Sequence, residues 1–246
     1  MITGTGAEAV ALWTPPPAWD DHLFTAFRLS FGSLLRLWFR MRIEGPTPPK
    51  GPYVLAANHR SFVDPLVLGA ATNARIVYLM TEVVWRARGL NWFYRWNRAV
   101  PVSARGGNRD ALRAARIVLQ QGRVLGIFPE GGLSRDGLPM LGSPGAVSLV
   151  MQEQVPIVPV GIVGAFEAMP PGATWPRPRP ITIRFGQPIL PAELELQGVG
   201  DRRIRLRAAT ALIMQRIAAL TGQTSREDEL AFAERERDRD RVAPIR

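Results

Sequence analysis

Short continuous runs of apolar residues alternate along the chain with segments whose apolar residues recur at helical spacing. The runs predict strands at 53–57, 75–80, 99–103, 124–128, 155–160 and 181–185. Helices are predicted from about residue 64, over 108–121, over 145–154 and over 201–221. Such alternation predicts an α/β fold: a single domain with a mixed, largely parallel sheet flanked by helices. Prolines at 156 and 159 predict an edge strand or a bulge for the 155–160 run, and the proline-rich segment 165–180 predicts a loop.

An amphipathic helix is predicted near the N-terminus, over residues 22–43. Its apolar residues fall within an arc of roughly 160° on a helical wheel. The polar residues of the segment, several of them arginines, lie opposite. An aromatic-rich apolar face with arginine on the polar face suits a helix lying in a membrane interface. The other interpretation is that this face packs on the protein's own domain, and the two are compatible. The apolar residues are Leu23, Phe24, Phe27, Phe31, Leu34, Leu35, Leu37, Trp38 and Met41, and the polar ones are His22, Thr25, Arg28, Ser33, Arg36 and Arg40.

The pattern divides the chain into four segments. Residues 1–21 are predicted to be irregular, 22–45 to form the amphipathic membrane-associating helix, 46–222 to form the α/β domain, and 223–246 to be a charged tail. The first segment contains three acidic residues and the run Pro15–Pro17, so it does not resemble a signal peptide. No charge-free segment is long enough to suggest a spanning helix.

The charge of the chain predicts anionic partners. The formal net charge is +10, and Lys50 is the single lysine among 31 basic residues. Arginine grips phosphate and carboxylate oxygens in pairs, so a phospholipid surface, phosphorylated substrates or nucleic acid would fit. Genomic base composition explains the arginine bias equally well.

The residue types available exclude several kinds of chemistry. There is no cysteine, which excludes disulfides, thiolate nucleophiles and cysteine-bound metals. With His22 and His59 as the two histidines, a histidine-rich metal site is excluded as well. At most a carboxylate metal site remains, no cluster of ligands stands out for one, and no metal or bound cofactor is predicted.

The run Asn58–Asp64 is the strongest chemical signal. It follows a predicted strand and places His59 five residues before Asp64. Imidazole moves protons near neutral pH, and a carboxylate can fix its tautomer. Because residues five apart lie about 140° apart on an ideal helix, the two side chains converge only if the chain turns between them. The alternative is a loop histidine beside an ordinary helix-capping aspartate.

A histidine–aspartate pair needs a nucleophile for acyl or phosphoryl transfer. Ser61 lacks the strand–turn–helix setting of a nucleophilic serine, so a capping or packing role is predicted for it. The pair would then activate a hydroxyl carried by the substrate, without a covalent enzyme intermediate.

The segment 128–137 is the second signal, because a strand runs there into a glycine-rich turn. Backbone N–H groups of Gly131 and Gly132 can approach an anion closely. The Glu130 carboxylate suits substrate hydroxyls, and Ser134 and Arg135 add donors. The alternative is a tight strand–helix turn with surface charges.

The segment 98–107 is a weaker signal. Arg98 and Arg105 flank a short extended piece that is followed by two glycines. Two arginines near a glycine pair can clamp a phosphate, although surface arginines are common in this chain.

Together these segments resemble the blocks of the phospholipid and glycerolipid acyltransferase family, of which 1-acyl-sn-glycerol-3-phosphate acyltransferase is the type. Asn58–Asp64 matches the N-H-x-x-x-x-D block, and Phe128–Gly131 matches the F-P-E-G block. Val100–Arg105 resembles the second block, and Val155–Val160 the proline-containing fourth block. The resemblance covers roughly residues 50 to 190.

The resemblance implies a glycerolipid acyltransferase-like fold, with 46–222 as the catalytic domain. It implies that His59 deprotonates a lysophospholipid hydroxyl, which attacks an acyl-CoA or acyl-carrier-protein thioester, and that Asp64 orients His59. Arg105 would bind the acceptor phosphate, while Glu130 and Gly131 would position its glycerol. The expected location is peripheral or monotopic on the cytoplasmic face of the cell membrane, on anionic phospholipid.

Two departures from the family pattern put the acceptor in doubt. Many members have Thr-Arg where this chain has Gly132 and Leu133, so either Arg135 replaces that arginine or the headgroup differs. The second block is one residue longer than usual, which makes Arg98 a competitor of Arg105.

Two alternatives to an acyltransferase acting on lysophosphatidic acid stay open. One is the same chemistry on a lyso-aminolipid, a glycolipid or glycerol-3-phosphate. The other is a non-catalytic basic module that binds anionic membrane or nucleic acid. The sequence contains no recognisable nucleic-acid motif, so no nucleic-acid partner is predicted.

Overall fold

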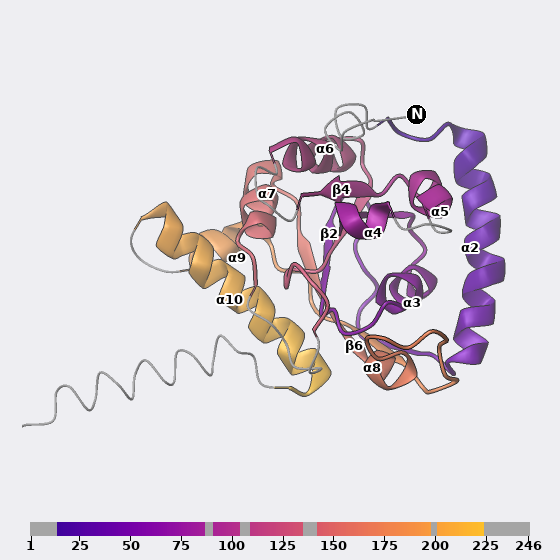
Figure 1. Ribbon diagram of the computed structural model, residues 1–246. Coiled ribbons are helices and arrows are strands. Elements are labelled where there is room, and N and C mark those ends of the chain that lie inside the picture. The colour runs from indigo at the N-terminus through magenta and orange to yellow at the C-terminus, as the bar shows by residue number, and fades with distance from the viewer. Residues whose placement is uncertain (1–13, 87–90, 104–108, 135–141, 198–200, 224–246) are drawn as a thin grey trace, which may run out of the picture.

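The computed structural model describes residues 14–86, 91–103, 109–134, 142–197 and 201–223 (Figure 1). Within these residues, seven strands form one sheet in the order β1-β7-β6-β2-β5-β3-β4. All strand pairs are parallel except β6 with β7. The strands are β1 (Arg42–Glu44), β2 (Val54–Ala57), β3 (Ile76–Thr81), β4 (Val100–Val102), β5 (Val124–Ile127), β6 (Ile157–Val163) and β7 (Thr182–Phe185).

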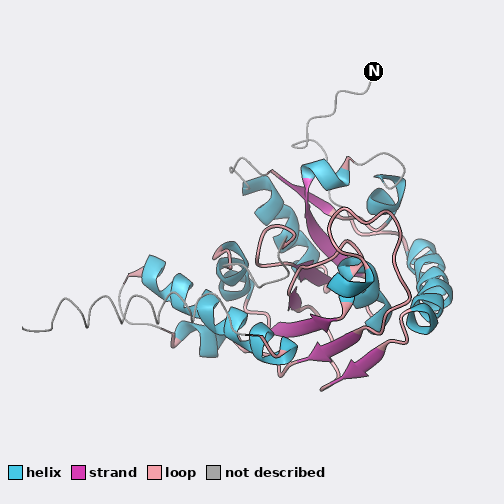
Figure 2. Cartoon of the chain, turned by 60° about the horizontal axis from the view of Figure 1, so that its bottom comes forward, coloured by secondary structure: helices cyan, strands magenta, loops and turns pink. Residues whose placement is uncertain are grey.

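Helices cover both faces of the sheet (Figures 1 and 2). Helices α6, α7, α9 and α10 pack on one face, and α2, α3 and α8 on the other. The helices are α2 (Ala18–Trp38), α3 (Asp64–Ala71), α4 (Glu82–Trp85), α5 (Asn91–Trp96), α6 (Arg109–Gln120), α7 (Gly145–Glu153), α8 (Ala165–Ala168), α9 (Pro191–Glu195) and α10 (Arg202–Thr221).

The central strand β2 is apolar at every position because it is buried on both of its faces. Val54 and Ala56 enter the core beneath α6, α7 and α10, whereas Leu55 and Ala57 enter the core beneath α2 and α3. Successive side chains of a strand point to opposite faces, so a strand covered on both faces has no solvent-facing position. The predicted fold class, an α/β domain with a mixed and largely parallel sheet, is confirmed.

The prediction of edge or bulge character for the 155–160 run is wrong. Strand β6 lies inside the sheet, between β2 and β7. Pro159 pairs with Ala56 of β2, and its carbonyl accepts a hydrogen bond from the N–H of Gly186 at 2.9 Å. The ladder with β7 ends at the pair Val160–Phe185, so the missing N–H of Pro159 falls beyond it and costs no ladder bond.

The N-terminal helix differs in its bounds from the predicted segment 22–45. Helix α2 begins at Ala18, where Asp20 and Asp21 favour a helix start through the helix dipole. It ends at Trp38, and Arg40 then adopts a positive φ of 43°. The following residues turn back as β1 and pair in parallel with β7, so 42–44 are strand rather than helix.

The apolar face of α2 is divided between the protein interior and the surface. Phe24, Phe27, Phe31 and Leu35 lie against α3 and α5, and Phe24 and Phe27 contact the ring of Trp96. A second row, which we call the α2 stripe, is exposed and consists of Trp19, Leu23, Leu34, Leu37 and Trp38. The interpretation that the helix packs on its own domain is confirmed for the first row, and membrane contact of the α2 stripe stays a prediction. None of the described helices is long and apolar enough to cross a membrane.

Two arginines of the predicted polar face bind the protein itself. Arg28 donates a hydrogen bond to the carbonyl of Thr72 at 2.7 Å, and Arg36 donates one to the carbonyl of Ala70 at 2.8 Å. Both carbonyls belong to the C-terminal end of α3, where cations satisfy unpaired acceptors and interact well with the helix dipole. These arginines dock α2 on α3.

Ion pairs attach the first turn of α2 to the core. Arg75 contacts Asp20 at 3.0 Å and Asp21 at 3.1 Å, and Arg123 contacts Asp21 at 2.6 Å. Burial raises the pKa of Asp21, but hydrogen bonds and charge attraction from Arg123 and Arg75 outweigh it, so the pKa lies below its ordinary value of 3.8.

Asp21→Asn should lower the free energy of unfolding by about 1 kcal/mol at neutral pH, because it removes both ion pairs of this carboxylate. Since the pKa is lower in the folded state, the contribution is fully present above pH 3.8 and is lost as pH falls through the folded-state pKa. Urea unfolding of wild type and variant at several pH values measures it. Glu44→Gln, which breaks an exposed pair with Arg184, is the control, and equal losses in both variants would contradict the prediction.

Candidate active site

The site lies at the carboxyl ends of the neighbouring strands β2 and β5. The segment after β2 carries His59, and the segment after β5 carries Glu130. Ligand sites of open α/β sheets form in this place because loops there diverge from a fixed edge. Asn58 fixes the start of the first loop: its side chain donates to the carbonyl of Ile162 at 2.9 Å and accepts from the N–H of Ile162 at 2.7 Å.

His59 and Asp64 converge as the spacing requires. The His59 Nδ1 atom lies 3.0 Å from Asp64 Oδ2, across the turn between β2 and α3. The same oxygen accepts hydrogen bonds from the backbone N–H groups of Arg60 and Ser61, each at 2.7 Å. The Asp64 side chain is completely buried, whereas that of His59 is 19% exposed. The buried carboxylate therefore holds both the loop and the imidazole.

This contact defines the tautomer of His59. A carboxylate accepts hydrogen bonds, so in the neutral imidazole the Nδ1 atom carries the hydrogen and the Nε2 atom carries the lone pair. The imidazole stacks on Phe128, with ring centroids 4.1 Å apart and planes 19° apart. Held on one edge by Asp64 and on one face by Phe128, the ring presents a base of fixed orientation.

The turn after β5 forms hydrogen bonds with the loop that contains His59. Glu130 Oε1 accepts a hydrogen bond from the backbone N–H of His59 at 3.0 Å, and the N–H of Ser134 donates to the carbonyl of His59, also at 3.0 Å. Gly131 adopts a φ of 70°, and its N–H donates to the carbonyl of Phe128. A positive φ favours glycine, so this residue makes the tight turn possible.

An apolar cavity of 470 Å³ opens beside His59. Its wall includes Phe62, Tyr78, Met80 and Leu149. Burial, with a smaller contribution from the negative charge of Asp64, raises the pKa of Tyr78 far above its ordinary value. The phenol therefore stays protonated and donates a hydrogen bond to the carbonyl of Pro65 at 2.8 Å.

The described residues of the site provide a base without a protein nucleophile. The Ser61 hydroxyl is directed to the carbonyl of Met169, at 2.7 Å, and also accepts from the N–H of Val63. Ser61 is fully buried, so its role is structural, as predicted. The arrangement can remove a proton from a hydroxyl that a substrate brings into the cavity. Among the described residues, no group of three or more His, Asp or Glu side chains is placed to hold a metal ion.

The family model described as Acyltransferase matches residues 39–163, which is half of the chain and includes both loops of the site. The chain belongs to the acyltransferase family. The crystal structure of the 1-acyl-sn-glycerophosphate acyltransferase PlsC from Thermotoga maritima is similar with a TM-score of 0.63, over 82% of this chain and 81% of that one. At 24% identity this similarity supports the acyltransferase fold.

Two acyltransferases of known sequence give the range of similarity. The 1-acyl-sn-glycerol-3-phosphate acyltransferase of Limnanthes douglasii is 30% identical over 155 residues, which are 61% of this chain and 54% of that protein. The protein of the same name from Bacillus subtilis (strain 168) is 24% identical over 174 residues, 70% of this chain and 83% of that protein. This chain thus spans about half the length of the plant relative.

The structure brings some of the predicted site residues together. Gly131 and Gly132 line the cavity with His59, and Ser134 is buried against the His59 loop. Glu130 is absent from the described cavity wall and instead holds the His59 backbone.

Two arginines are predicted to bind a phosphate, and the structure describes one of them. Arg98 precedes β4 and lies at the amino ends of the strands: the adjacent Asn97 bonds the carbonyl of Ile76, the first residue of β3. That edge is opposite to the His59 loop. Arg105, and likewise Arg135, lie outside the described residues.

Three residues contribute to the site although no role was predicted for them from the sequence: Asn58, Phe128 and Tyr78. Asn58 and Phe128 belong to the recognised motifs, and an amide directly after a buried strand is a usable signal for bonding to a neighbouring strand. Tyr78 carried no signal, because its place beside Pro65 depends on how β3 and α3 pack.

Asn58→Ala should lower the free energy of unfolding by about 2–4 kcal/mol, because it leaves two buried backbone groups of Ile162 without partners. Thermal and denaturant unfolding measure the loss. Gln152→Ala is the control: this exposed side chain has one hydrogen bond to Ser148 and should change stability by less than about 0.5 kcal/mol. A variant as stable as wild type would show that the two hydrogen bonds from Asn58 to β6 are not needed for stability.

Proposed function

We propose that the chain transfers a fatty acyl group from an acyl-CoA or acyl-carrier-protein thioester to the free hydroxyl of a lysophospholipid. Lysophosphatidic acid is the proposed acceptor and phosphatidic acid the product. The observation that carries the proposal is the 3.0 Å contact of His59 Nδ1 with buried Asp64, at the wall of an apolar cavity. The names of the relatives from Limnanthes douglasii and Bacillus subtilis support the choice of acceptor.

The proposed reaction proceeds by direct attack. His59 Nε2 accepts the proton of the acceptor hydroxyl, and the oxygen forms a bond to the thioester carbonyl carbon. The carbon–sulfur bond then breaks, and the leaving thiolate takes up the proton from the imidazolium. The Asp64 carboxylate stabilises the imidazolium between these steps, and a general base so held contributes about 10²- to 10⁴-fold in rate.

The cavity suits the acyl chain of the thioester. Its described wall is formed almost entirely by apolar side chains and backbone, and His59 lies at that wall. An acyl chain in the cavity and a headgroup at the glycine turn would place the two reacting groups together, which converts a bimolecular encounter into an oriented reaction. For the acceptor phosphate we favour Arg105 over Arg98, because Arg98 lies at the amino ends of the strands, opposite to the His59 loop.

A different acceptor is the second candidate. Gly132 and Leu133 both line the cavity at the point where many relatives carry Thr-Arg. This wall offers less charge to a phosphate, which favours a lyso-aminolipid or a glycolipid as the alternative. Glycerol-3-phosphate, which carries a phosphate but no acyl chain, is the remaining alternative acceptor. A panel of these acceptors, ranked by kcat/KM with one acyl-CoA, separates the candidates.

The α2 stripe supports contact with a lipid surface. Leu34 and Leu37 are 58% and 77% exposed, on a helix whose opposite side packs on α3. Exposed apolar rows of this kind mark interaction sites, and an amphipathic helix of this composition binds in the plane of a bilayer interface. An acyltransferase so placed would take its acceptor directly from the membrane.

His59→Ala should lower kcat for acyl transfer to lysophosphatidic acid by about 10²- to 10⁴-fold in detergent, because it removes the base. Asp64→Asn should lower kcat with little change in acceptor KM, since Asp64 lies behind His59 and not on the described cavity wall. His22→Ala, on the surface of α2, is the matched control. If His59→Ala keeps wild-type acyl transfer, the proposed base is wrong and the chemistry does not depend on His59.

Leu34→Glu/Leu37→Glu should reduce co-sedimentation with anionic vesicles at least about tenfold, because it places charge on the α2 stripe. Deleting 23–43 is unsuitable, since it would also remove Phe24 and Phe39 from the core. Leu190→Glu/Leu196→Glu alters two equally exposed leucines elsewhere and should bind like wild type. Equal binding by both double variants would dismiss the role of the stripe.

A further inference from the structure

The proline-rich loop 169–180 connects the site loop to the end of α2. At its start, the Ser61 hydroxyl donates to the carbonyl of Met169 at 2.7 Å. Near its end, Arg40 donates to the carbonyl of Pro178 at 3.2 Å. The N–H of Arg177 also donates to the carbonyl of Ala168 at 2.8 Å, which closes the loop on α8. Prolines with fixed φ and these three contacts give the loop a defined shape.

Close backbone approach fixes the base of the same loop. Gly164, with a φ of 89°, lies so near the carbonyl of Pro180 that an added Cβ atom would be 2.2 Å from the oxygen. The N–H of Ile181 then donates to the carbonyl of Phe39 at 3.0 Å, directly after α2. The loop and the C-terminal end of α2 therefore form one continuous surface.

This loop exposes a tryptophan followed by two arginines. Trp175 is 82% exposed, and Arg177 and Arg179 are exposed as well. A large aromatic side chain directed to solvent by a braced loop has no structural role in the described protein. Tryptophan is enriched at membrane–water interfaces, where one part of the ring is apolar and the other is wet.

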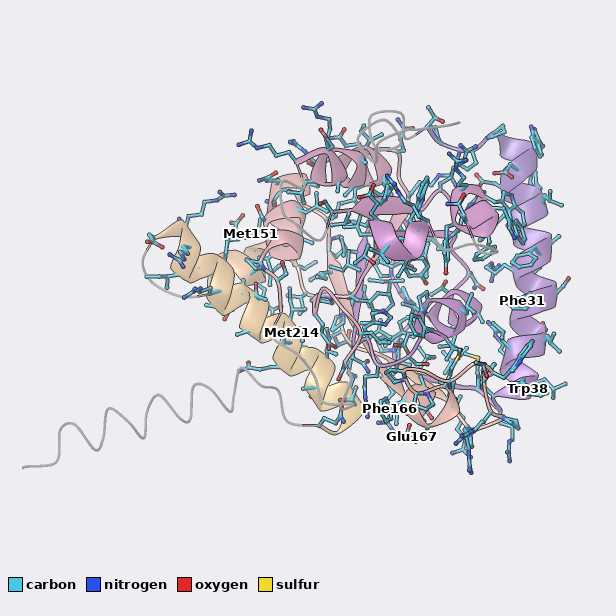
Figure 3. The ribbon with its side chains drawn as sticks, in the orientation of Figure 1. Phe31, Trp38, Met151, Phe166, Glu167 and Met214 are labelled. Atoms are coloured by element: carbon cyan, nitrogen blue, oxygen red, sulfur yellow. The ribbon has the colours of Figure 1, made fainter. Side chains whose placement is uncertain are left out.

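The loop adjoins the end of α2 at which the α2 stripe ends. Leu37 and Trp38 end the stripe, and Arg40 joins it to the loop through Pro178. Figure 3 shows Trp38 at one end of α2, and Phe166 and Glu167 on α8 at the same end of the molecule. An open hollow of 590 Å³ lies beside α8, and Arg177 and Arg179 are part of its lining with Glu167.

We propose that the loop 169–180 is a second lipid-contact element, with Trp175 in the bilayer interface and Arg177 and Arg179 bound to the phosphates of anionic headgroups. The proposal rests on the membrane contact of α2 proposed above and extends it to a segment distant in sequence. Apolar aromatic and fixed positive charge in one surface match a negatively charged interface. The loop would then keep the bound membrane surface close to the loop that contains His59.

Because the chain has no cysteine, a single cysteine can report on this loop. Trp175→Cys, labelled with an environment-sensitive NBD fluorophore, should show a blue shift and increased emission with vesicles of phosphatidylcholine and phosphatidylglycerol. Leu196→Cys, at an equally exposed position after α9, is the matched control and should not respond. Helix α9 lies beside α10, on the other side of the molecule from α2 (Figure 1). Unchanged emission at 175 while the protein co-sediments with the vesicles would overturn the proposal.

Arg177→Gln/Arg179→Gln tests the charge contribution. Partitioning onto the same vesicles should fall on the order of 30-fold at low salt, the effect expected for two arginines near an anionic surface, and less at high salt. Arg203→Gln/Arg207→Gln, on the exposed side of α10, makes the same charge change and should bind like wild type.

Three other outcomes would overturn the proposal. They are equal losses in both arginine variants, an equal response to pure phosphatidylcholine, and a response at 175 to an acidic acyl-carrier protein but not to vesicles. A wild-type protein that binds no vesicles would overturn it too, whereas acyl transfer in detergent tests the proposed reaction separately.

Discussion

The arrangement of the site depends on one buried oxygen, Asp64 Oδ2. It accepts hydrogen bonds from two backbone N–H groups and contacts the Nδ1 atom of His59. A buried charge is costly unless it is hydrogen-bonded, so the three contacts of this oxygen favour the loop conformation that wraps around it. The requirement of a stable interior and the requirement of an oriented base are met by the same contacts. Asp64 also begins α3, where the helix dipole favours its negative charge.

The sheet brings this local contact together with the other residues of the site. Strands β2 and β5 are parallel neighbours, so the loops that follow them meet at one edge. There Glu130 binds the His59 backbone, Phe128 covers the imidazole, and the apolar cavity opens beside it. The proposed acyl transfer needs an apolar space and a proton acceptor side by side. A sheet buried on both faces supplies the first, and the polar loops at its edge supply the second.

Helix α2 contributes residues both to the protein interior and to the surface. Its aromatic residues pack against α5, its arginines bind the end of α3, and its remaining apolar residues are exposed. The loop 169–180 is attached at one end to α2 and at the other to Ser61. The proposed membrane contact and the proposed base are therefore parts of a continuous structure.

The sequence by itself determined the α/β class and most element positions, because these follow from apolar periodicity. It indicated that His59 and Asp64 could converge, but left open whether the chain turns between them, which the structure decided. It also indicated the acyltransferase family, through the order of its motifs. Tertiary structure decided the rest. Pro159 lies in a central strand because the β6–β7 ladder stops beside it, and Arg28 and Arg36 turn to the carbonyls of α3. It also placed Arg98 at the opposite edge from His59, and the loop 169–180 against the segment after α2. Each of these depends on which segments distant in sequence become neighbours, and no local pattern encodes that.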